Sequence, residues 1–340
     1  MHPAFAGLVT IVIGVGGCLA YFWLSNQFLD KVLFPARGPN AGRNINRANQ
    51  IRPWLFLFPA LFALSLYLAY PVIETIRLSL TERVTQSDGS TIYQFVGLAN
   101  YAQMADDPKF WEAMFNNMMW LIVVPALSTA FGLLAAQLTD RIKWGNIAKS
   151  LIFMPMAISF VGAAVIWKLI YDARPPDASQ IGVVNAIYVG LTGNDPVQLL
   201  TVPFWNNFFL MIVLVWIQTG FAMVILSAAL RGIPEETIEA AIVDGANPFQ
   251  IFFKIKMPQI MGTIVVVWTT ITLVVLKVFD IVFAMTNGQW GTQVLANYMY
   301  NQLFVTRDWG VGSASAMIIM LLVTPILIWN VRNARAEMRG

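Results

Sequence analysis

Residues 239–258 read Glu239-Ala-Ala-Ile-Val-Asp-Gly-Ala-Asn-Pro-Phe-Gln-Ile-Phe-Phe-Lys-Ile-Lys-Met-Pro258, a polar interruption between two long apolar runs. This pattern predicts two short helices joined at a corner. Gly245 can take the left-handed conformation that ends a helix. Asn247 then offers an N-cap and Pro248 a first-turn residue for the second helix, and Pro258 is expected to end that helix.

The spacing of this segment is Glu-Ala-Ala, three residues, Gly, nine residues, Ile, one residue, Met-Pro. It resembles the coupling-loop motif of the membrane subunits of binding-protein-dependent ABC importers, which have Leu in place of Met257. An ordinary amphipathic loop helix is the alternative. The resemblance implies that a partner ATPase docks on this loop, where small residues fit a groove and acidic residues meet basic ones. The residues that it assigns to ATPase coupling are Glu239, Ala240, Ala241, Asp244, Gly245, Ile255 and Pro258.

The composition indicates an all-α, polytopic membrane protein, because 58% of the 340 residues are hydrophobic and only 11% are charged. A bilayer core needs about 20 apolar residues as a helix. About seven segments fit a span, and they are 4–24, 54–73, 118–138, 150–167, 208–230, 261–285 and 312–331. The resemblance implies a six-helix importer core, so the first span is an extra N-terminal helix.

The domain organisation follows from these spans. Residues 1–53 form the extra helix and a basic cytoplasmic linker, 54–331 the permease domain with its coupling loop at 231–260, and 332–340 a cytoplasmic tail. Lys and Arg number fourteen in the linker, the third loop, the coupling loop and the tail, against six in the other loops. The positive-inside rule therefore predicts a multi-pass inner-membrane protein with its N-terminus outside and its C-terminus in the cytoplasm.

Segments outside the coupling loop resemble permeases of the carbohydrate-uptake family. Residues 95–101 and 107–111 look like the first external loop of these permeases, and 279–288 like their sixth-span exit. The family usually shows Thr-x-Gly-Gly-x-Pro at that exit, and Asn287, Gln289 and Trp290 depart from this pattern. The segments around Ala296-Asn297 and Arg307–Gly310 look closest to alpha-glucoside permeases of the maltose type.

The sequence contains few residues that could form a catalytic site. No Gly-x4-Gly-Lys-Ser/Thr loop occurs, so the chain is not expected to hydrolyse ATP. The lone Cys18 and the terminal His2 offer no metal site or catalytic triad, and we expect no bound cofactor and no nucleic-acid partner. The resemblance implies two ATPase subunits that hold ATP and Mg²⁺, a second homologous permease, an extracytoplasmic sugar-binding protein, a sugar substrate and the surrounding bilayer.

A substrate site near the bilayer midplane is the general expectation for transporters. Gln218 lies halfway along the fifth span, with Trp216 and Phe221 close by, and Thr269 and Thr272 lie near the middle of the sixth. Amides and hydroxyls can bind sugar hydroxyls, and aromatic faces can stack on sugar rings. Hydrogen bonding between helices is the alternative role for the polar residues.

Two charges fall within the sixth span. Lys277 and Asp280 are three residues apart, on one face of a continuous helix. Each would cost about 2.5–3.5 kcal/mol at the centre of a lipid-facing helix, so they must face the bundle or pair. A structural ion pair toward the outer end of the span is the preferred interpretation, and a gate or polar lining of the path is the other.

These observations favour a permease subunit of an ABC sugar importer, with an alpha-glucoside such as maltose, trehalose or sucrose as substrate. Glycerol-phosphate or another polar solute is the alternative within transport. An integral membrane enzyme or a receptor is the alternative from another class. An enzyme would need clustered acid, base or metal ligands in the spans, where only Lys277 and Asp280 are available.

Overall fold

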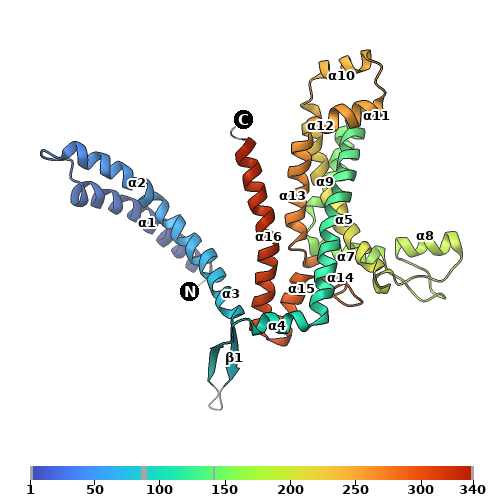
Figure 1. Ribbon diagram of the computed structural model, residues 1–340, viewed down its shortest axis with the longest axis horizontal. Helices are drawn as coiled ribbons and strands as arrows, with labels where there is room; N and C mark the ends of the chain where they lie inside the picture. Colours follow the sequence, from blue (N-terminus) through green and yellow to red (C-terminus); the bar gives the residue numbers. More distant parts are fainter. Residues whose placement is uncertain (1–2, 86–89, 141, 338–340) are drawn as a thin grey trace. The chain divides into compact units, whose positions relative to one another are not determined.

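The computed structural model describes residues 3–85, 90–140 and 142–337 (Figure 1). Asp88-Gly89, a dipeptide whose sequence predicts a turn, lies outside these residues. Five described helices are long and apolar enough to cross a membrane, and the number reaches seven if each of two bent helix pairs counts as one span. The predicted all-α, polytopic membrane fold is confirmed. The chain divides into two compact units, 1–74 and 75–340.

The first unit is a helical hairpin. Tyr21 donates a hydrogen bond to the Leu55 carbonyl (3.0 Å), and Arg52 binds both carboxylate oxygens of Asp30 (2.6 and 2.9 Å). Its elements are α1 (Pro3–Phe28), the π-helical turn η1 (Leu29–Leu33), α2 (Ala41–Leu64), the π-helical turn η2 (Ser65–Ala69) and the start of α3 (Tyr70–Ser79).

This hairpin corrects two predictions about the N-terminal region. The predicted linker, which occupies 25–53 after the first predicted span, is mostly helical, and within it only 34–40 lie outside the helices. The domain boundary predicted between 53 and 54 falls inside α2, which continues through Pro53 from polar into apolar sequence. Hydropathy changes at that point, but the backbone remains helical. An α-helix forms hydrogen bonds between its own backbone polar groups, in water and in lipid alike.

The second unit begins with the end of α3, and a hairpin of two antiparallel strands follows, in which Thr81 pairs with Phe95. Its elements are β1 (Thr81–Thr85), β2 (Thr91–Phe95), α4 (Ala99–Asp106), α5 (Pro108–Thr139), α6 (Gly145–Phe153), η3 (Met154–Ala157), α7 (Phe160–Ile170), α8 (Val183–Thr192), η4 (Leu199–Thr201), α9 (Trp205–Arg231), α10 (Glu235–Val243), α11 (Pro248–Gln250), η5 (Ile251–Lys256), α12 (Met257–Gln259), α13 (Met261–Val275), α14 (Asp280–Met285), α15 (Leu295–Tyr300), η6 (Asn301–Thr306) and α16 (Trp309–Glu337).

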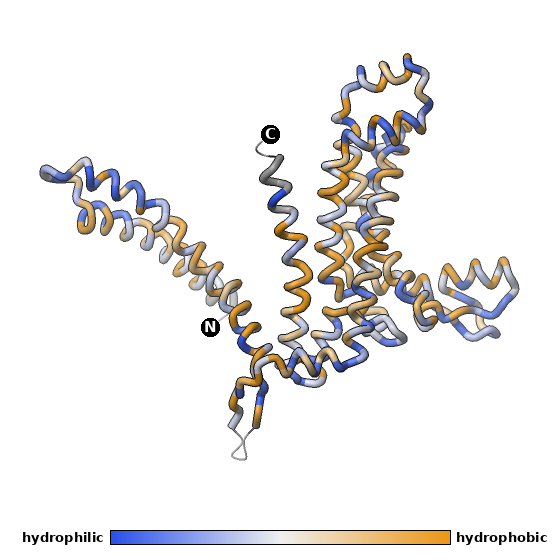
Figure 2. The backbone as a smooth tube through the Cα atoms, in the orientation of Figure 1, coloured by the Kyte–Doolittle hydropathy of each residue, from blue (hydrophilic) through white to orange (hydrophobic). Residues whose placement is uncertain are grey.

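Helices α5, α9 and α13 pack side by side as the core of this unit (Figure 1). Small residues allow the close approach. A Cβ on Gly132 would lie 2.4 Å from the Cβ of Ala222, and one on Gly220 would lie 2.6 Å from the Ile152 carbonyl oxygen. Close backbone packing over small residues is typical of membrane helices. Hydrophobic residues line these helices, and hydrophilic ones gather at the end that carries α10 (Figure 2).

Two predicted spans are broken helices. The span expected at 150–167 is an α6–η3 segment and α7, which meet at 105°. Ser159 ends the break, because its hydroxyl accepts a hydrogen bond from the Gly162 N–H (3.1 Å) and caps α7. The helix expected over 261–285 ends at Val275, and at its start it meets the helix Pro248–Gln259 at 71°.

Candidate functional site

The first helix of the coupling loop, α10, ends in the predicted left-handed glycine. Gly245 has φ of +81°. Its N–H donates to the Ile242 carbonyl (3.0 Å), and the Ala246 N–H donates to the Ala241 carbonyl (2.9 Å). This pair of hydrogen bonds is the Schellman arrangement, which satisfies carbonyls that the end of a helix leaves open. The predicted corner is therefore confirmed at Gly245.

The second helix begins at the predicted cap. The Asn247 side chain accepts from the Gln250 N–H and the Gln250 side chain accepts from the Asn247 N–H, both at 2.9 Å, which forms a capping box ahead of Pro248. The helix runs through the π-helical turn η5 and ends at Gln259, one residue beyond Pro258. Proline has no backbone N–H and therefore leaves one helical hydrogen bond unmade. The π-helical turn before Pro258 accommodates this loss, so the helix continues past the proline before it bends.

Exposure separates the predicted coupling residues into two groups. Glu239, Ala240, Asp244, Gly245 and Pro258 are exposed, Ile255 is half-buried and Ala241 is buried. Ala241 is therefore less accessible to a partner's groove than Ala240, which is exposed. The Ala241 side chain faces this chain, because it lies three residues after the half-buried Ile238 on the inner face of α10.

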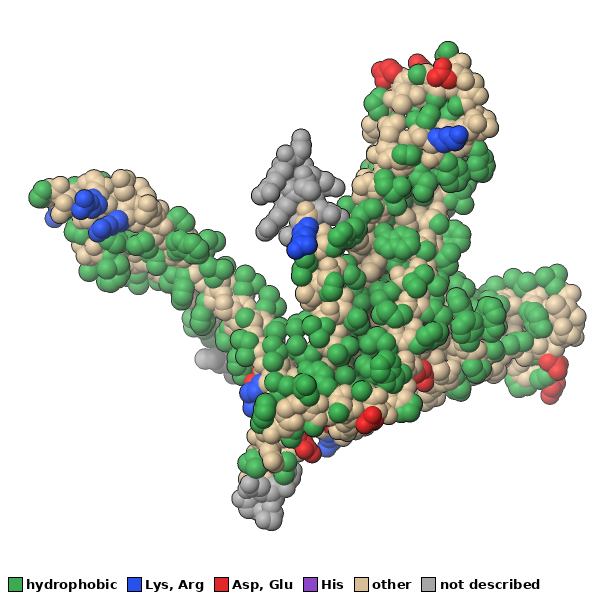
Figure 3. Space-filling view, viewed as in Figure 1, with side chains coloured by type: hydrophobic (Ala, Val, Ile, Leu, Met, Phe, Trp, Pro, Cys, Tyr) green, Lys and Arg blue, Asp and Glu red, His purple; other side chains and the backbone are tan. Residues whose placement is uncertain are grey.

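The exposed apolar residues of this loop were missed by the sequence analysis. Val243 is 86% exposed and Phe249 75%, and Ile242 and Phe253 are also exposed. Phe249 and Phe253 lie one turn apart, with ring centroids 5.4 Å apart. Acidic side chains gather at the end of the second unit that carries α10 (Figure 3). Apolar residues on a predicted loop helix, outside any span, were the signal that could have identified this surface.

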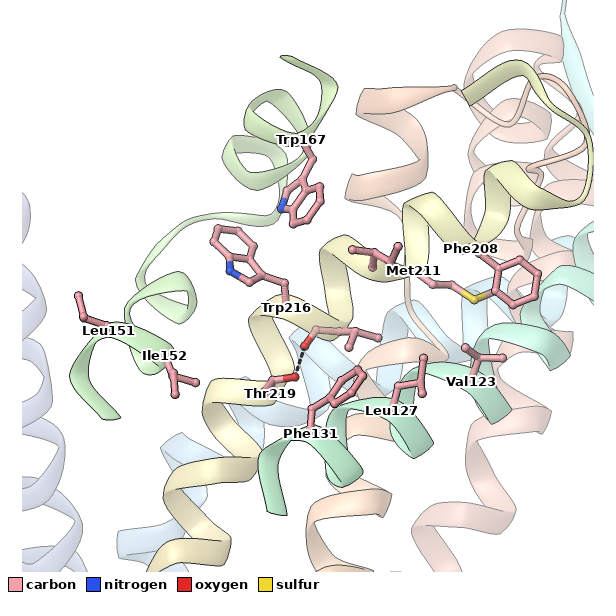
Figure 4. A pocket seen from close by; sticks show the side chains of 12 residues that line it. Val123, Leu127, Phe131, Leu151, Ile152, Trp167, Phe208, Met211, Trp216 and Thr219 are labelled. Atoms are coloured by element: carbon pink, nitrogen blue, oxygen red, sulfur yellow. Dashed lines mark hydrogen bonds between the residues drawn. The ribbon is translucent and has the colours of Figure 1, made fainter. Parts of the chain in front are cut away.

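A cavity of about 650 Å³ lies between α5, α6, α7 and α9 (Figure 4). The Trp167 and Trp216 rings meet edge to face, with centroids 5.7 Å apart. The Trp167 Nε1 is buried and has no hydrogen-bond partner among the described residues. The lining residues are Val123, Leu127, Phe131, Leu151, Ile152, Trp167, Phe208, Met211, Ile212, Val215, Trp216 and Thr219.

Only one of the five predicted path residues, Trp216, lines this cavity. Gln218 is 6% exposed and lies on another face of α9, because a two-residue step turns a helix by more than half a circle. Phe221 is half-buried and is not part of the lining either. The neighbour of Gln218, Thr219, lines the cavity, and its hydroxyl donates to the Val215 carbonyl (2.7 Å).

The two predicted threonines of the sixth span are occupied within their own helix. The Thr269 hydroxyl donates to the Val265 carbonyl (3.0 Å), and that of Thr272 to the Trp268 carbonyl (2.8 Å). Neither residue lines the cavity. Back-bonding to the preceding turn is a common role of threonine in helices, and it gives both hydroxyls a partner without any substrate.

The predicted ion pair between Lys277 and Asp280 is wrong, because the salt bridges among the described residues do not include it. The two residues do not share a continuous helix. Lys277 follows the C-terminus of α13, and Asp280 is the first residue of α14. A positive charge is favourable near a helix C-terminus and a negative charge near an N-terminus, so the helix dipoles stabilise each charge separately.

The end of the unit away from α10 contains a clamp of asparagines that the sequence analysis missed. Asn116 donates to the carbonyls of Gly291 (2.9 Å) and Gln293 (2.8 Å), and Asn206 donates to that of Trp290 (2.7 Å). Their neighbours Asn117 and Asn207 also bond to this loop, and all four amides are buried. The repeated Asn-Asn pair ahead of two apolar runs was the available signal.

Tyr298 connects the same end of the unit to the start of α5. Its hydroxyl donates to the Asp107 carboxylate (2.8 Å), and Asp107 caps α5 by accepting from the Lys109 N–H (2.9 Å). Burial, followed by the hydrogen bond to Asp107, raises the pKa of Tyr298. The phenol therefore remains a hydrogen-bond donor over the whole physiological pH range.

The opposite end of the bundle carries a polar cluster that joins α5, α6 and α9. Lys149 forms an ion pair with Asp140 and donates to the Ser227 hydroxyl (2.6 Å). Ser227 donates to the Asp140 carboxylate (3.1 Å), and Arg231 lies 3.9 Å from the same carboxylate. The cluster stands directly before the coupling loop, so it ties three helices together where that loop leaves α9.

A polytopic helical bundle whose spans are joined by a capped helix–corner–helix loop is the architecture of an importer membrane subunit. The chain belongs to the family of binding-protein-dependent transport system inner membrane components, whose sequence profile matches residues 95–336. It is a multi-pass inner-membrane permease of an ABC importer, a transport component rather than an enzyme, as predicted.

Two relatives and one solved structure illustrate the similarity. The chain is 62% identical over 344 residues to the alpha-glucoside transport system permease protein AglF of Rhizobium meliloti (strain 1021), and the alignment covers 100% of both chains. It is 47% identical to the osmoprotective compounds uptake permease protein GgtC of Synechocystis sp., over 83% of this chain and 99% of that one. A bacterial ABC transporter that imports the acidic polysaccharide alginate shares the fold, with a TM-score of 0.71 at 20% identity over 86% of this chain and 98% of that chain.

Proposed function

We propose that this permease carries an alpha-glucoside such as maltose, trehalose or sucrose. The observation that carries the proposal is the 62% identity to an alpha-glucoside permease along the full length of both chains. Uptake of another polar solute is the second candidate, favoured by the 47% identity to a permease for osmoprotective compounds.

The cavity between α5, α6, α7 and α9 is this chain's part of the sugar path. Its volume of about 650 Å³ lies within the roughly 300–1,000 Å³ typical of small-ligand sites. The indole rings of Trp167 and Trp216 present flat apolar faces to the C–H face of a sugar ring. The unpartnered Trp167 N–H is available to donate to a sugar hydroxyl. Most of the lining is apolar, so a second homologous permease supplies the remaining polar contacts.

The coupling loop is the docking surface for the partner ATPase. Val243, Phe249 and Phe253 present exposed apolar side chains, with Glu239 and Asp244 exposed beside them. Apolar anchors surrounded by charged residues are typical of protein interfaces. Two ATPase subunits hold ATP and Mg²⁺, and their rigid-body motion moves the helices on either side of the loop. An extracytoplasmic sugar-binding protein delivers the substrate at the asparagine-clamped end.

This arrangement places the coupling loop and the C-terminus in the cytoplasm and the N-terminus outside. The support is the excess of Lys and Arg in alternate loops, fourteen against six. In this orientation, the asparagine clamp lies at the extracytoplasmic end of the bundle.

Uptake of labelled maltose, trehalose and sucrose by the assembled importer in vesicles tests the proposal. Trp216→Ala should lower uptake per assembled complex, because it removes one stacking face of the cavity. Val224→Ala is the matched control, since this exposed α9 residue lies outside the cavity. Uptake of none of the three sugars, together with uptake of glycerol-phosphate or an osmoprotective solute, would contradict the substrate class.

A further inference from the structure

The loop between α7 and α9 contains a helix whose apolar side faces outward. Helix α8 carries no charged residue, and Leu191 is 82% exposed. Val183 and Ile187 precede it at four-residue spacing and are exposed as well, with Ile181 just before the helix. We call these four residues the α8 stripe. Side chains four residues apart share one helical face, so the stripe is continuous.

The opposite face of α8 is fixed to the protein by a buried asparagine. Asn185 is 1% exposed and donates to the carbonyls of Asp172 and Val197, both at 3.1 Å. Its carbonyl oxygen accepts from the Val197 N–H (2.8 Å). A Cβ on Gly182 would lie 2.1 Å from the Asp172 carbonyl oxygen, so the start of α8 is packed tightly as well. The helix therefore cannot roll to bury its stripe without breaking these bonds.

The depth of α8 follows from its tie to α9. The Tyr171 hydroxyl at the end of α7 donates to the Phe209 carbonyl (3.1 Å). Phe209 lies four residues into α9, or about 6 Å along its axis. The 27 residues of α9 span about 40 Å, about 10 Å more than the hydrocarbon core. Phe204 and Trp205 are exposed at its start, as interfacial aromatics are. This end of α9, and α8 with it, thus lies at the membrane–water boundary.

The direction of α8 agrees with that depth. It runs across the axes of α5 and α9 rather than along them (Figure 1). Hydrophobic side chains gather along the edge of α8 that faces the coupling-loop end of the bundle, and acidic side chains lie at the opposite edge (Figure 3). Asp177 and Asp195 are exposed in the loops on either side of α8. The apolar edge therefore faces the membrane interior and the acidic edge faces water.

We propose that α8 is an in-plane membrane helix, with the α8 stripe inserted among the acyl chains of the outer leaflet. The occupant is lipid because the stripe is apolar and uncharged, and because exposed apolar side chains continue from it onto the neighbouring spans (Figure 3). A helix with one apolar face binds in the interface by burying that face about 5–10 Å deep. The anchor fixes the outer end of α7, whose Trp167 lines the cavity. The leaflet assignment rests on the proposed orientation.

Collision of a nitroxide label with oxygen and with a water-soluble nickel chelate tests the proposal. Cys18→Ser removes the only native cysteine, and Ile187→Cys and Leu191→Cys each place one label on the exposed stripe. Asp195→Cys is the water-facing control. The assembled importer is reconstituted in phosphatidylethanolamine–phosphatidylglycerol vesicles. The oxygen-to-nickel collision ratio is expected to be several-fold higher at 187 and 191 than at 195.

Two results would overturn the proposal. Nickel collisions at 187 and 191 as frequent as those at 195 would place the stripe in water. Loss of collisions with both reagents would show that another protein subunit covers it. Neither readout depends on the solute carried, so a failed sugar-uptake assay leaves this experiment interpretable.

Discussion

Replacing Gly245 by Val should uncouple the permease from its ATPase while leaving the chain in the membrane. Gly245 has φ of +81°, and the hydrogen bonds that close α10 depend on that angle. A Cβ at this position meets nothing within 4 Å, so the penalty comes from the backbone conformation rather than from a clash. The left-handed conformation costs an L-residue about 1–2 kcal/mol, and a β-branched residue is the least compatible with it. A penalty of that size shifts the population of the correct corner by a factor of about 5–30.

Asn and Ala at the same position are matched controls. Asn visits the left-handed region more readily than other non-glycine residues, and Ala lacks the β-branch. Coupling should therefore decrease in the order Gly, Asn, Ala, Val. The measurements are co-purified ATPase per permease and uptake in vesicles, with the amount of permease in the membrane determined by immunoblot. Equal coupling by the Asn, Ala and Val variants at equal permease levels would refute the backbone argument.

Trp216→Ala should reduce uptake per assembled complex severalfold and spare ATP hydrolysis stimulated by the binding protein, and loss of both would contradict a role confined to the cavity. Gln218→Ala should instead reduce assembly, because Gln218 is buried and truncating a buried side chain leaves a cavity between the helices. Normal assembly with failed uptake would indicate that Gln218 lines the substrate path. Asp140→Asn should lower the thermal unfolding temperature, since it leaves the Lys149 ammonium without its counter-ion, and an unchanged temperature would show that the cluster is not stabilising. A reporter that is active only in the cytoplasm should work when it is fused after residue 340 and be inactive when it is fused within 177–182. The reverse pattern would show that the predicted topology is inverted.

The coupling loop could be predicted from sequence because each of its features has a local cause. The left-handed angle at Gly245 and the cap at Asn247 depend on residues within a few positions of them. The orientation of Ala241 depends instead on which face of α10 packs against the rest of the chain. The motif contains no information about that packing, so a residue assigned to the partner's groove is in fact buried within this protein.

The broken spans could not be predicted from hydropathy, which is similar on both sides of each break. The prediction of a Lys277–Asp280 pair assumed one continuous helix, but the helix is interrupted at 276–279, so Lys277 lies in the interruption and Asp280 begins α14. Residue counting also gave the depth of Gln218 without its direction. Two positions that differ by a single step point to different faces of α9, and Thr219 rather than Gln218 faces the cavity.

Helix α9 is the element that connects the coupling loop with the cavity. It is unbroken from Trp205 to Arg231, and α10 begins four residues after it ends. Two asparagines clamp its N-terminal end, and Ser227 near its C-terminal end joins the Lys149–Asp140 pair. A helix without an internal break transmits a displacement along its length, whereas the corners of 105° between α6 and α7 and 71° before α13 can change their backbone angles. We therefore expect ATPase motion to move α9 as one body and the α6–α7 corner to flex. That movement changes the distance between Trp216 on α9 and Trp167 on α7, which form the aromatic wall of the cavity.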